Sequence, residues 1–173
     1  LARGKLHILA GAPGTGKTHL ALALCAFSDE AGLRSAYLPL AAASGRLGEA
    51  LDALEGNDVV ALDGLEAVAG NPNDEVALFH FHNRARSAGV NVLYGARSAP
   101  DLLGLELPDL KSRLAQCNRV LLDPLDDAGR AAVLRDRAQR RGLVLDEAAI
   151  DWLLARMDRD LVCLVALLDR LDR

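Results

Sequence analysis

The sequence predicts an α/β fold with a parallel five-stranded sheet, followed by a small unit of three helices. Two observations lead to this prediction. Short apolar segments alternate with helical segments through the first two thirds of the chain, and strand signals stop after Asp123-Pro124. Because alternating strands and helices are typical of parallel sheets, we expect helices on both faces of the sheet. The boundary near Pro124 separates two predicted domains, residues 1–123 and 124–173.

Short apolar segments supply the five predicted strands, at residues 5–10, 34–38, 59–62, 91–96 and 120–122. Helices are predicted between them over residues 17–31, 45–54 and 74–88. Arg84 and Arg86 are expected to be exposed near the end of the last of these helices. The alanines at 41–43 are expected to form a loop that leads into a helix.

Three helical segments are predicted after the boundary, over residues 126–141, 146–156 and 160–171. Asp126 and Asp146 are suitable N-caps, because a carboxylate there accepts hydrogen bonds from the free backbone N–H groups of the first turn. Gly142 ends the first of the three helices. Trp152, with the leucines that follow it, is expected in the core of this unit.

Length and composition describe a globular protein with one domain, or one domain and a small lid. Of the 173 residues, 51% are apolar and 25% charged. No apolar stretch reaches the roughly 20 residues of a membrane span, so no membrane association is expected. Cys25, Cys117 and Cys163 are scattered, which predicts neither disulfides nor zinc and fits a reducing, cytoplasmic setting. With 24 acidic and 20 basic side chains, the chain lacks the positive field that direct DNA binding usually requires.

A phosphate-binding motif follows the first predicted strand. The segment Gly-Ala-Pro-Gly-Thr-Gly-Lys-Thr matches GxxxxGK[ST] in full and leads into a helix. Glycines allow successive N–H groups to converge on phosphates, and the helix N-terminus adds partial positive charge. Lys17 is expected to reach the β- and γ-phosphates and Thr18 to ligate Mg²⁺. The predicted nucleotide-binding residues here are Gly11, Ala12, Pro13, Gly14, Thr15, Gly16, Lys17, Thr18 and His19, the last of which could also simply pack or contact solvent.

A second acidic group is expected to reach the Mg²⁺ shell from a neighbouring strand. Asp63 ends the apolar segment Val-Val-Ala-Leu and is the candidate, although an Asp in a turn before Gly64 is also common in α/β proteins. Many ATPases of this class place another acid directly after this Asp to polarise water, and Gly64 stands there instead. Glu66 could substitute only at a distance. The sequence therefore favours nucleotide binding over rapid hydrolysis.

The segments GAPGTGKTHL, VVALDGLE and LPDLKSRL, together with the helical tail, resemble the DnaA/Hda family of AAA+ proteins over nearly the whole chain. The segments from LPDLKSRL onward look closer to Hda. The resemblance implies an AAA+ domain with a C-terminal lid that binds ADP or ATP with Mg²⁺. Thr18 and Asp63 would hold the Mg²⁺, partly through water.

The same resemblance implies roles for three arginines. Arg113, in the SRL segment, corresponds to an arginine finger that acts on the nucleotide of a neighbouring subunit. Without the family context, Arg113 would be a surface residue on a short helix. Arg159 corresponds to the lid residue called sensor II, and its alternative is a helix-start arginine paired with a neighbouring Asp. Arg97 lies near the position of sensor I.

The sequence departs from the family pattern at three places. Gly64 and Ala96 stand where the family commonly carries acids near the γ-phosphate. Gln116-Cys117 stands where the family often has Trp-Gly, which puts the local backbone turn in doubt. The first two departures predict weak intrinsic ATPase activity and suit a protein that rests with ADP.

The resemblance predicts a regulator that stimulates ATP hydrolysis on the initiator DnaA through Arg113 and so represses re-initiation of replication. Its expected partners are DnaA, the sliding clamp through an N-terminal motif that these residues lack, and possibly further copies of itself. The alternatives are the AAA+ domain of an initiator, or a helper ATPase of the helicase-loader or transposition type.

His80 and His82 point to different helix faces, so a shared metal site is not expected.

Overall fold

The computed structural model describes residues 4–156. The chain divides into two compact units, Leu1–Leu122 and Asp123–Arg173. The predicted helix over residues 160–171 lies outside the described residues. Within the described part, no helix is long and apolar enough to cross a membrane.

The first unit is built on a five-stranded sheet whose strands all run parallel. The strands follow one another across the sheet in the order β2-β3-β4-β1-β5. This confirms the predicted parallel sheet, and β5 begins two residues earlier than predicted. The strand bounds are β1 Leu6–Ala10, β2 Ser35–Pro39, β3 Val59–Asp63, β4 Asn91–Ala96 and β5 Asn118–Leu121.

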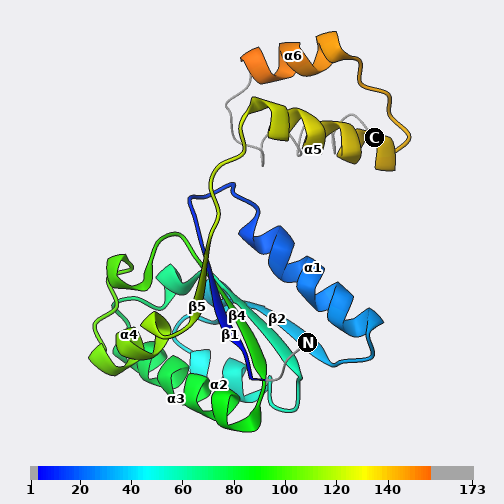
Figure 1. The fold of residues 1–173 in the computed structure, drawn as a ribbon. Coiled ribbons are helices and arrows are strands. Elements are labelled where there is room, and N and C mark those ends of the chain that lie inside the picture. Colours follow the sequence, from blue (N-terminus) through cyan, green and yellow to red (C-terminus); the bar gives the residue numbers. More distant parts are fainter. Residues whose placement is uncertain (1–3, 157–173) are drawn as a thin grey trace. The chain divides into compact units, whose positions relative to one another are not determined.

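Helices cover both faces of the sheet, as predicted, but unequally. Helix α1 (Lys17–Glu30) lies on one face, and α2 (Leu47–Asp52), α3 (Pro72–Ala88) and α4 (Pro108–Ala115) lie on the other (Figure 1). The larger apolar core lies on the side of α2, α3 and α4, and a smaller one lies under α1. The sheet is therefore packed between two apolar layers, one on each face.

Three local differences from the sequence prediction have identifiable causes. Helix α3 begins two residues early because the Asn71 side chain caps it, accepting the N–H groups of Asn73 and Asp74, and Pro72 follows in the first helical position. Helix α2 begins two residues later than predicted because Gly45, with φ of 78°, lies in a turn before it, and it ends at Asp52, two residues early. The expected loop at 41–43 is part of the 3₁₀ helix Leu40–Ala43, and further 3₁₀ helices span Leu65–Ala67 and Pro100–Leu102.

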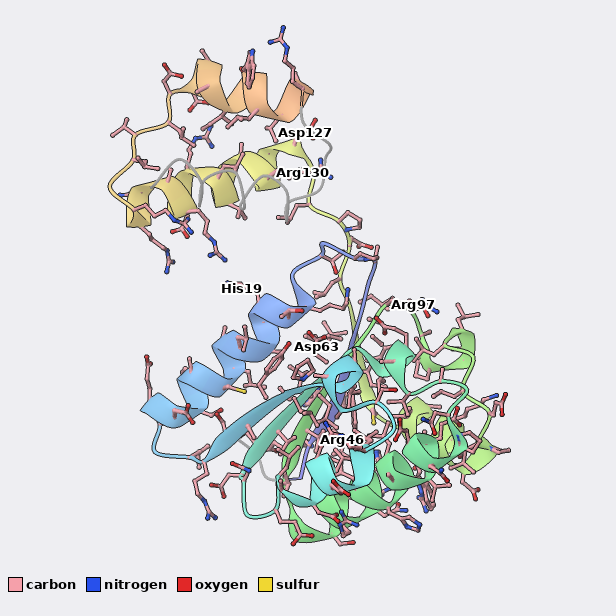
Figure 2. The ribbon with its side chains drawn as sticks, turned by 180° about the vertical axis from the view of Figure 1, so that it is seen from behind. His19, Arg46, Asp63, Arg97, Asp127 and Arg130 are labelled. Carbon is pink, nitrogen blue, oxygen red and sulfur yellow. The ribbon has the colours of Figure 1, made fainter. Side chains whose placement is uncertain are left out.

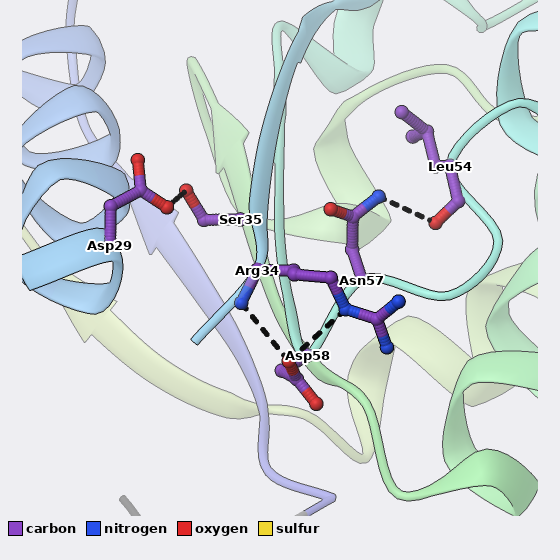
Figure 3. A network of polar contacts seen from close by, with 6 residues as sticks. All are labelled: Asp29, Arg34, Ser35, Leu54, Asn57 and Asp58. Atoms are coloured by element: carbon purple, nitrogen blue, oxygen red, sulfur yellow. Dashed lines mark hydrogen bonds and ion pairs between the residues drawn. The ribbon is translucent and has the colours of Figure 1, made fainter. Parts of the chain in front are cut away.

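A polar network joins the starts of β2 and β3 (Figure 3). The Asp58 carboxylate accepts the Arg34 N–H at 3.0 Å and lies 3.8 Å from Arg34 Nε. The Arg34 carbonyl in turn accepts the N–H groups of Asp58 and Val59. In the β2–β3 pairing Pro39 lies opposite Asp63, and in the β3–β4 pairing Asp63 lies opposite Gly95.

The second unit contains α5 (Asp127–Arg140) and α6 (Glu147–Arg156). Asp126 accepts the Gly129 N–H at 2.7 Å and Asp146 accepts the Ala149 N–H at 2.7 Å, so both act as predicted N-caps. The prediction for Trp152 was wrong. Its side chain is 53% exposed, because the helical repeat turns Leu153 inward instead, and the Arg156 guanidinium lies 5.1 Å from the Trp152 ring centroid.

Candidate nucleotide-binding site

Gly11 begins the phosphate-binding motif at a point where only a glycine fits. Its N–H donates to the Ala96 carbonyl at 3.1 Å, which binds the loop to the end of β4. A Cβ added at Gly11 would lie 2.5 Å from the Leu122 carbonyl oxygen and 2.8 Å from Thr15 Oγ1. The loop then turns at Gly16, whose φ of 89° is accessible mainly to glycine. The motif glycines therefore allow the backbone to curl tightly before α1.

The ammonium group of Lys17 lies within this loop. Lys17 Nζ donates to the carbonyl oxygens of Gly11 at 2.7 Å and Ala12 at 2.8 Å. The first turn of α1 contains no acidic residue. The partial positive charge of the helix N-terminus and the Lys17 charge therefore act on the same small region, which fits the binding of phosphate oxygens.

Three side-chain oxygens converge at the end of β3. Thr18 Oγ1 donates to Asp63 Oδ2 at 2.5 Å, and the Tyr37 hydroxyl donates to the same oxygen at 3.1 Å. Burial, and then the negative charge of Asp63, raise the pKa of Tyr37 above its usual value. A Cβ on Gly95 would overlap the Asp63 carboxylate, so glycine there leaves room for it. Hydroxyl and carboxylate oxygens are ligands that Mg²⁺ prefers, so Thr18 and Asp63 fit a magnesium site.

Tyr37 was not predicted from the sequence. Its ring lies on β2, two residues before the strand ends, and it meets Asp63 only because β2 and β3 are neighbours. A tyrosine in a strand more often packs in a core than binds a site acid, so the sequence contained no specific signal for this contact.

The chain turns sharply immediately after Asp63. Gly64 has φ of 87° and donates its N–H to the Gly95 carbonyl at 3.0 Å. The turn allows Glu66 to accept the backbone N–H of Arg97 at 3.1 Å. Glu66 thus ties the residues after β3 to the residue after β4.

The remaining predicted residues at this edge of the sheet divide between surface and core. Figure 2 shows His19, Asp63 and Arg97 at the same edge of the first unit, and both His19 and Arg97 are exposed. Ala96, where the family commonly has an acid, is fully buried. Lys17, Thr18 and Asp63 are therefore brought together by the fold, whereas Arg159 lies outside the described residues.

Arg113 lies at the opposite end of the sheet from the phosphate-binding loop. It is on the last turn of α4 and, with Lys5, Leu6 and Asn118, lines a hollow beside the starts of β1 and β5. The loop follows the end of β1, and a five-residue strand spans roughly 15 Å. The structure thus separates Arg113 from the P-loop of its own chain.

Comparisons with known proteins agree with this architecture. Residues 127–173 match the family model of the Hda lid domain. Domain III of the Thermotoga maritima replication initiation protein DnaA superposes with a TM-score of 0.83 at 21% identity, covering 96% of this chain and 74% of that one. A replication initiator DnaA bound to AMPPCP and single-stranded DNA gives a TM-score of 0.78 at 22% identity, covering 97% of this chain.

A solution structure of a Neisseria meningitidis protein is 30% identical, with a TM-score of 0.51, and covers 66% of this chain and 72% of that one. The chain spans 56% of the nucleotide- and DNA-bound DnaA chain, so it corresponds to about half of that protein. The DnaA structures share the fold of the described units, and the lid match adds family-specific sequence. Residues 127–173 therefore match the lid domain of Hda, and the chain shares its fold with the DnaA structures.

Proposed function

We propose that this protein is an Hda-like regulator that binds ADP or ATP with Mg²⁺ and stimulates ATP hydrolysis on the initiator DnaA, repressing re-initiation of replication. The observation that carries the proposal is the position of Arg113. It lines an open hollow at the edge of the sheet opposite the chain's own P-loop. A guanidinium in that position can serve only a nucleotide that another molecule presents.

The nucleotide-binding part of the proposal depends on the loop geometry. Lys17 and the N-terminus of α1 supply positive charge for the phosphates, and Thr18 and Asp63 supply oxygens for the metal. Bound Mg²⁺ would neutralise part of the phosphate charge. A DnaA structure from Aquifex aeolicus is bound to AMPPCP, which supports a nucleotide at the corresponding loop.

The weak intrinsic hydrolysis that we propose follows from the residues beside Asp63. Gly64 brings no carboxylate to the position next to Asp63, and the Ala96 methyl group is buried. Glu66 is the nearest acidic residue in sequence, and one of its carboxylate oxygens is held by the Arg97 N–H. Without a positioned acid to polarise water, turnover by the chain alone is expected to be slow.

The regulatory part of the proposal depends on what an arginine can do in trans. A guanidinium donates hydrogen bonds in a fixed fork that matches phosphate oxygens, and it stabilises charge that develops on the transferred phosphoryl group. Arginine fingers of this kind increase hydrolysis rates by about 10³- to 10⁵-fold. The Hda lid match supports DnaA as the partner. Sliding-clamp binding and self-association are further parts of the proposal.

A phosphate-release assay tests the proposal. The full-length protein is added to ATP-loaded DnaA in the presence of the DNA-loaded clamp, and phosphate is followed over time. We expect stimulation by the wild type and none by Arg113→Ala, with ADP binding unchanged. Arg84→Ala is a matched control, because Arg84 forms exposed ion pairs with Asp52 and Glu55 away from the hollow.

Two results would contradict the proposal. The first is absence of stimulation by the wild type, or equal stimulation by Arg113→Ala. The second is rapid steady-state hydrolysis by the protein alone, which would favour a helper ATPase whose own turnover is its function.

A further inference from the structure

The hollow that contains Arg113 is rich in positive charge. It has a volume of about 300 Å³ and is formed by the segment before β1, the last turns of α3 and α4, and the start of β5. Lys5, Arg86 and Arg113 line it, and none of its lining residues is acidic. At about 30 Å³ per water molecule, the hollow has room for roughly ten waters, which is enough for a chain of phosphate groups.

Neither arginine of the hollow is neutralised by the part of the chain that the structure describes. The side chains of Arg86 and Arg113 form no ion pair or hydrogen bond there, whereas Arg84 on the same helix contacts Asp52 at 2.6 Å. Two guanidinium groups of like charge around one hollow repel each other. An anion between them would remove this repulsion and satisfy both sets of donors.

Two titratable side chains in the wall of the hollow, His82 and Cys117, have shifted pKa values. His82 is 1% exposed, and its Nδ1 lies 3.0 Å from the Tyr94 hydroxyl. Burial, followed by the charges of Arg113 and Arg86, lowers the pKa of His82 to about 4. Burial also raises the pKa of Cys117 to about 11. At neutral pH both groups are uncharged, so the cations of the hollow face no compensating charge in its wall.

We propose that Arg86 is a second phosphate-binding guanidinium that acts beside Arg113, so that the hollow receives the phosphate chain of a nucleoside triphosphate presented by a partner molecule. That this nucleotide belongs to a partner molecule rests on the proposed function. The two arginines approach from different helices, α3 and α4, and can therefore contact different phosphate oxygens. Lys5 adds a third positive charge from the segment before β1.

The hydrolysis assay described above separates this proposal from the proposed function. We expect Arg86→Ala to reduce the stimulation of DnaA by about tenfold or more, the effect of losing charged hydrogen bonds to phosphate. Arg84→Ala, two residues away on the same helix, should remain at the wild-type level. Arg86→Lys should restore only part of the stimulation, because an ammonium lacks the planar fork.

The outcomes for the two arginines can be told apart. If Arg113→Ala leaves stimulation intact, the proposed function fails. If Arg113→Ala abolishes stimulation but Arg86→Ala behaves like Arg84→Ala, the proposed function stands and the role of Arg86 is overturned.

A binding measurement tests the hollow without DnaA. Tripolyphosphate is titrated into the protein carrying Lys17→Ala, which weakens the chain's own phosphate loop, and heat and the NMR signals of the His82 ring are followed. We expect binding that raises the pKa of His82 from about 4, since the anion offsets the two arginine charges. Adding Arg86→Ala should weaken binding about tenfold and reduce the shift, and Arg84→Ala should change neither. Absence of binding, or equal binding after Arg86→Ala, would overturn the proposal.

Discussion

The positively charged side chains at the two edges of the sheet differ in their partners. At the edge where the strands end, Lys17 is held by carbonyl oxygens, Thr18 and Tyr37 are bound to Asp63, and Glu66 holds the Arg97 backbone. At the edge where the strands begin, Arg86 and Arg113 line an open hollow that contains no carboxylate. The first edge is organised by contacts within the chain. In the second, the side chains of Arg86 and Arg113 have no carboxylate partner among residues 4–156, and this difference is the basis of the role that we propose for them.

Two helices connect these edges, and a buried carboxylate joins them. Glu75, on the first turns of α3, is 1% exposed and accepts the Gly70 N–H at 3.0 Å, the Glu106 N–H at 2.9 Å and the Leu107 N–H at 2.6 Å. Gly70 lies in the segment after β3, and Leu107 immediately precedes α4. Glu75 thus binds the region after Asp63 to the start of α4, whose last turn carries Arg113.

The largest effect is expected at this link. Glu75→Ala leaves three backbone N–H groups without their acceptor, and an unsatisfied buried group costs about 1–3 kcal/mol. The free energy of unfolding, measured with urea, should fall by at least about 3 kcal/mol. Glu106→Ala is the matched control, since its exposed side chain should change stability by less than about 0.5 kcal/mol. Equal stability of the two variants would show that Glu75 does not link the segment before α3 to the start of α4.

Lys17→Ala tests whether the phosphate loop and the hollow bind anions independently. Removing charge-assisted hydrogen bonds to phosphate should weaken ADP binding about 100-fold, measured by calorimetry, and Lys111→Ala should leave it unchanged. Tripolyphosphate binding in the hollow should persist in Lys17→Ala. Loss of both activities in this one variant would contradict the view that the two edges are independent anion sites.

His82 allows a smaller, pH-dependent test of the edge with the arginines. Its folded pKa of about 4 lies below the unfolded value near 6.5, so the unfolded chain binds more protons between these values. The contribution of His82 to the free energy of unfolding is therefore fully present above about pH 6.5 and is lost as the pH falls toward 4. Between pH 7.5 and pH 5 the loss should be about 2 kcal/mol by urea denaturation. In His82→Gln, which keeps an acceptor for Tyr94, the loss should be smaller by that amount. An unchanged dependence would mean that His82 is not the responsible group.

Local sequence signals predicted much of the fold and only part of the candidate site. Apolar segments located the five strands, and Asp126 and Asp146 located two helix starts, because these signals act over a few neighbouring residues. The sequence indicates that Gly64 stands in place of a second acid and that a turn could precede it. In the structure its positive φ also forms the turn that lets Glu66 reach Arg97.

The sequence by itself determined that residues 11–18 form a tight glycine-rich loop that leads into a helix, because the glycines, the lysine and the helix start are consecutive. Only the tertiary structure decided that Tyr37 meets Asp63, and that Arg86 shares a hollow with Arg113. These pairs lie on different strands or helices, and their distances depend on strand order and helix packing. Contacts of that kind have no local signature, because the residues that form them have ordinary alternative roles on a surface or in a core.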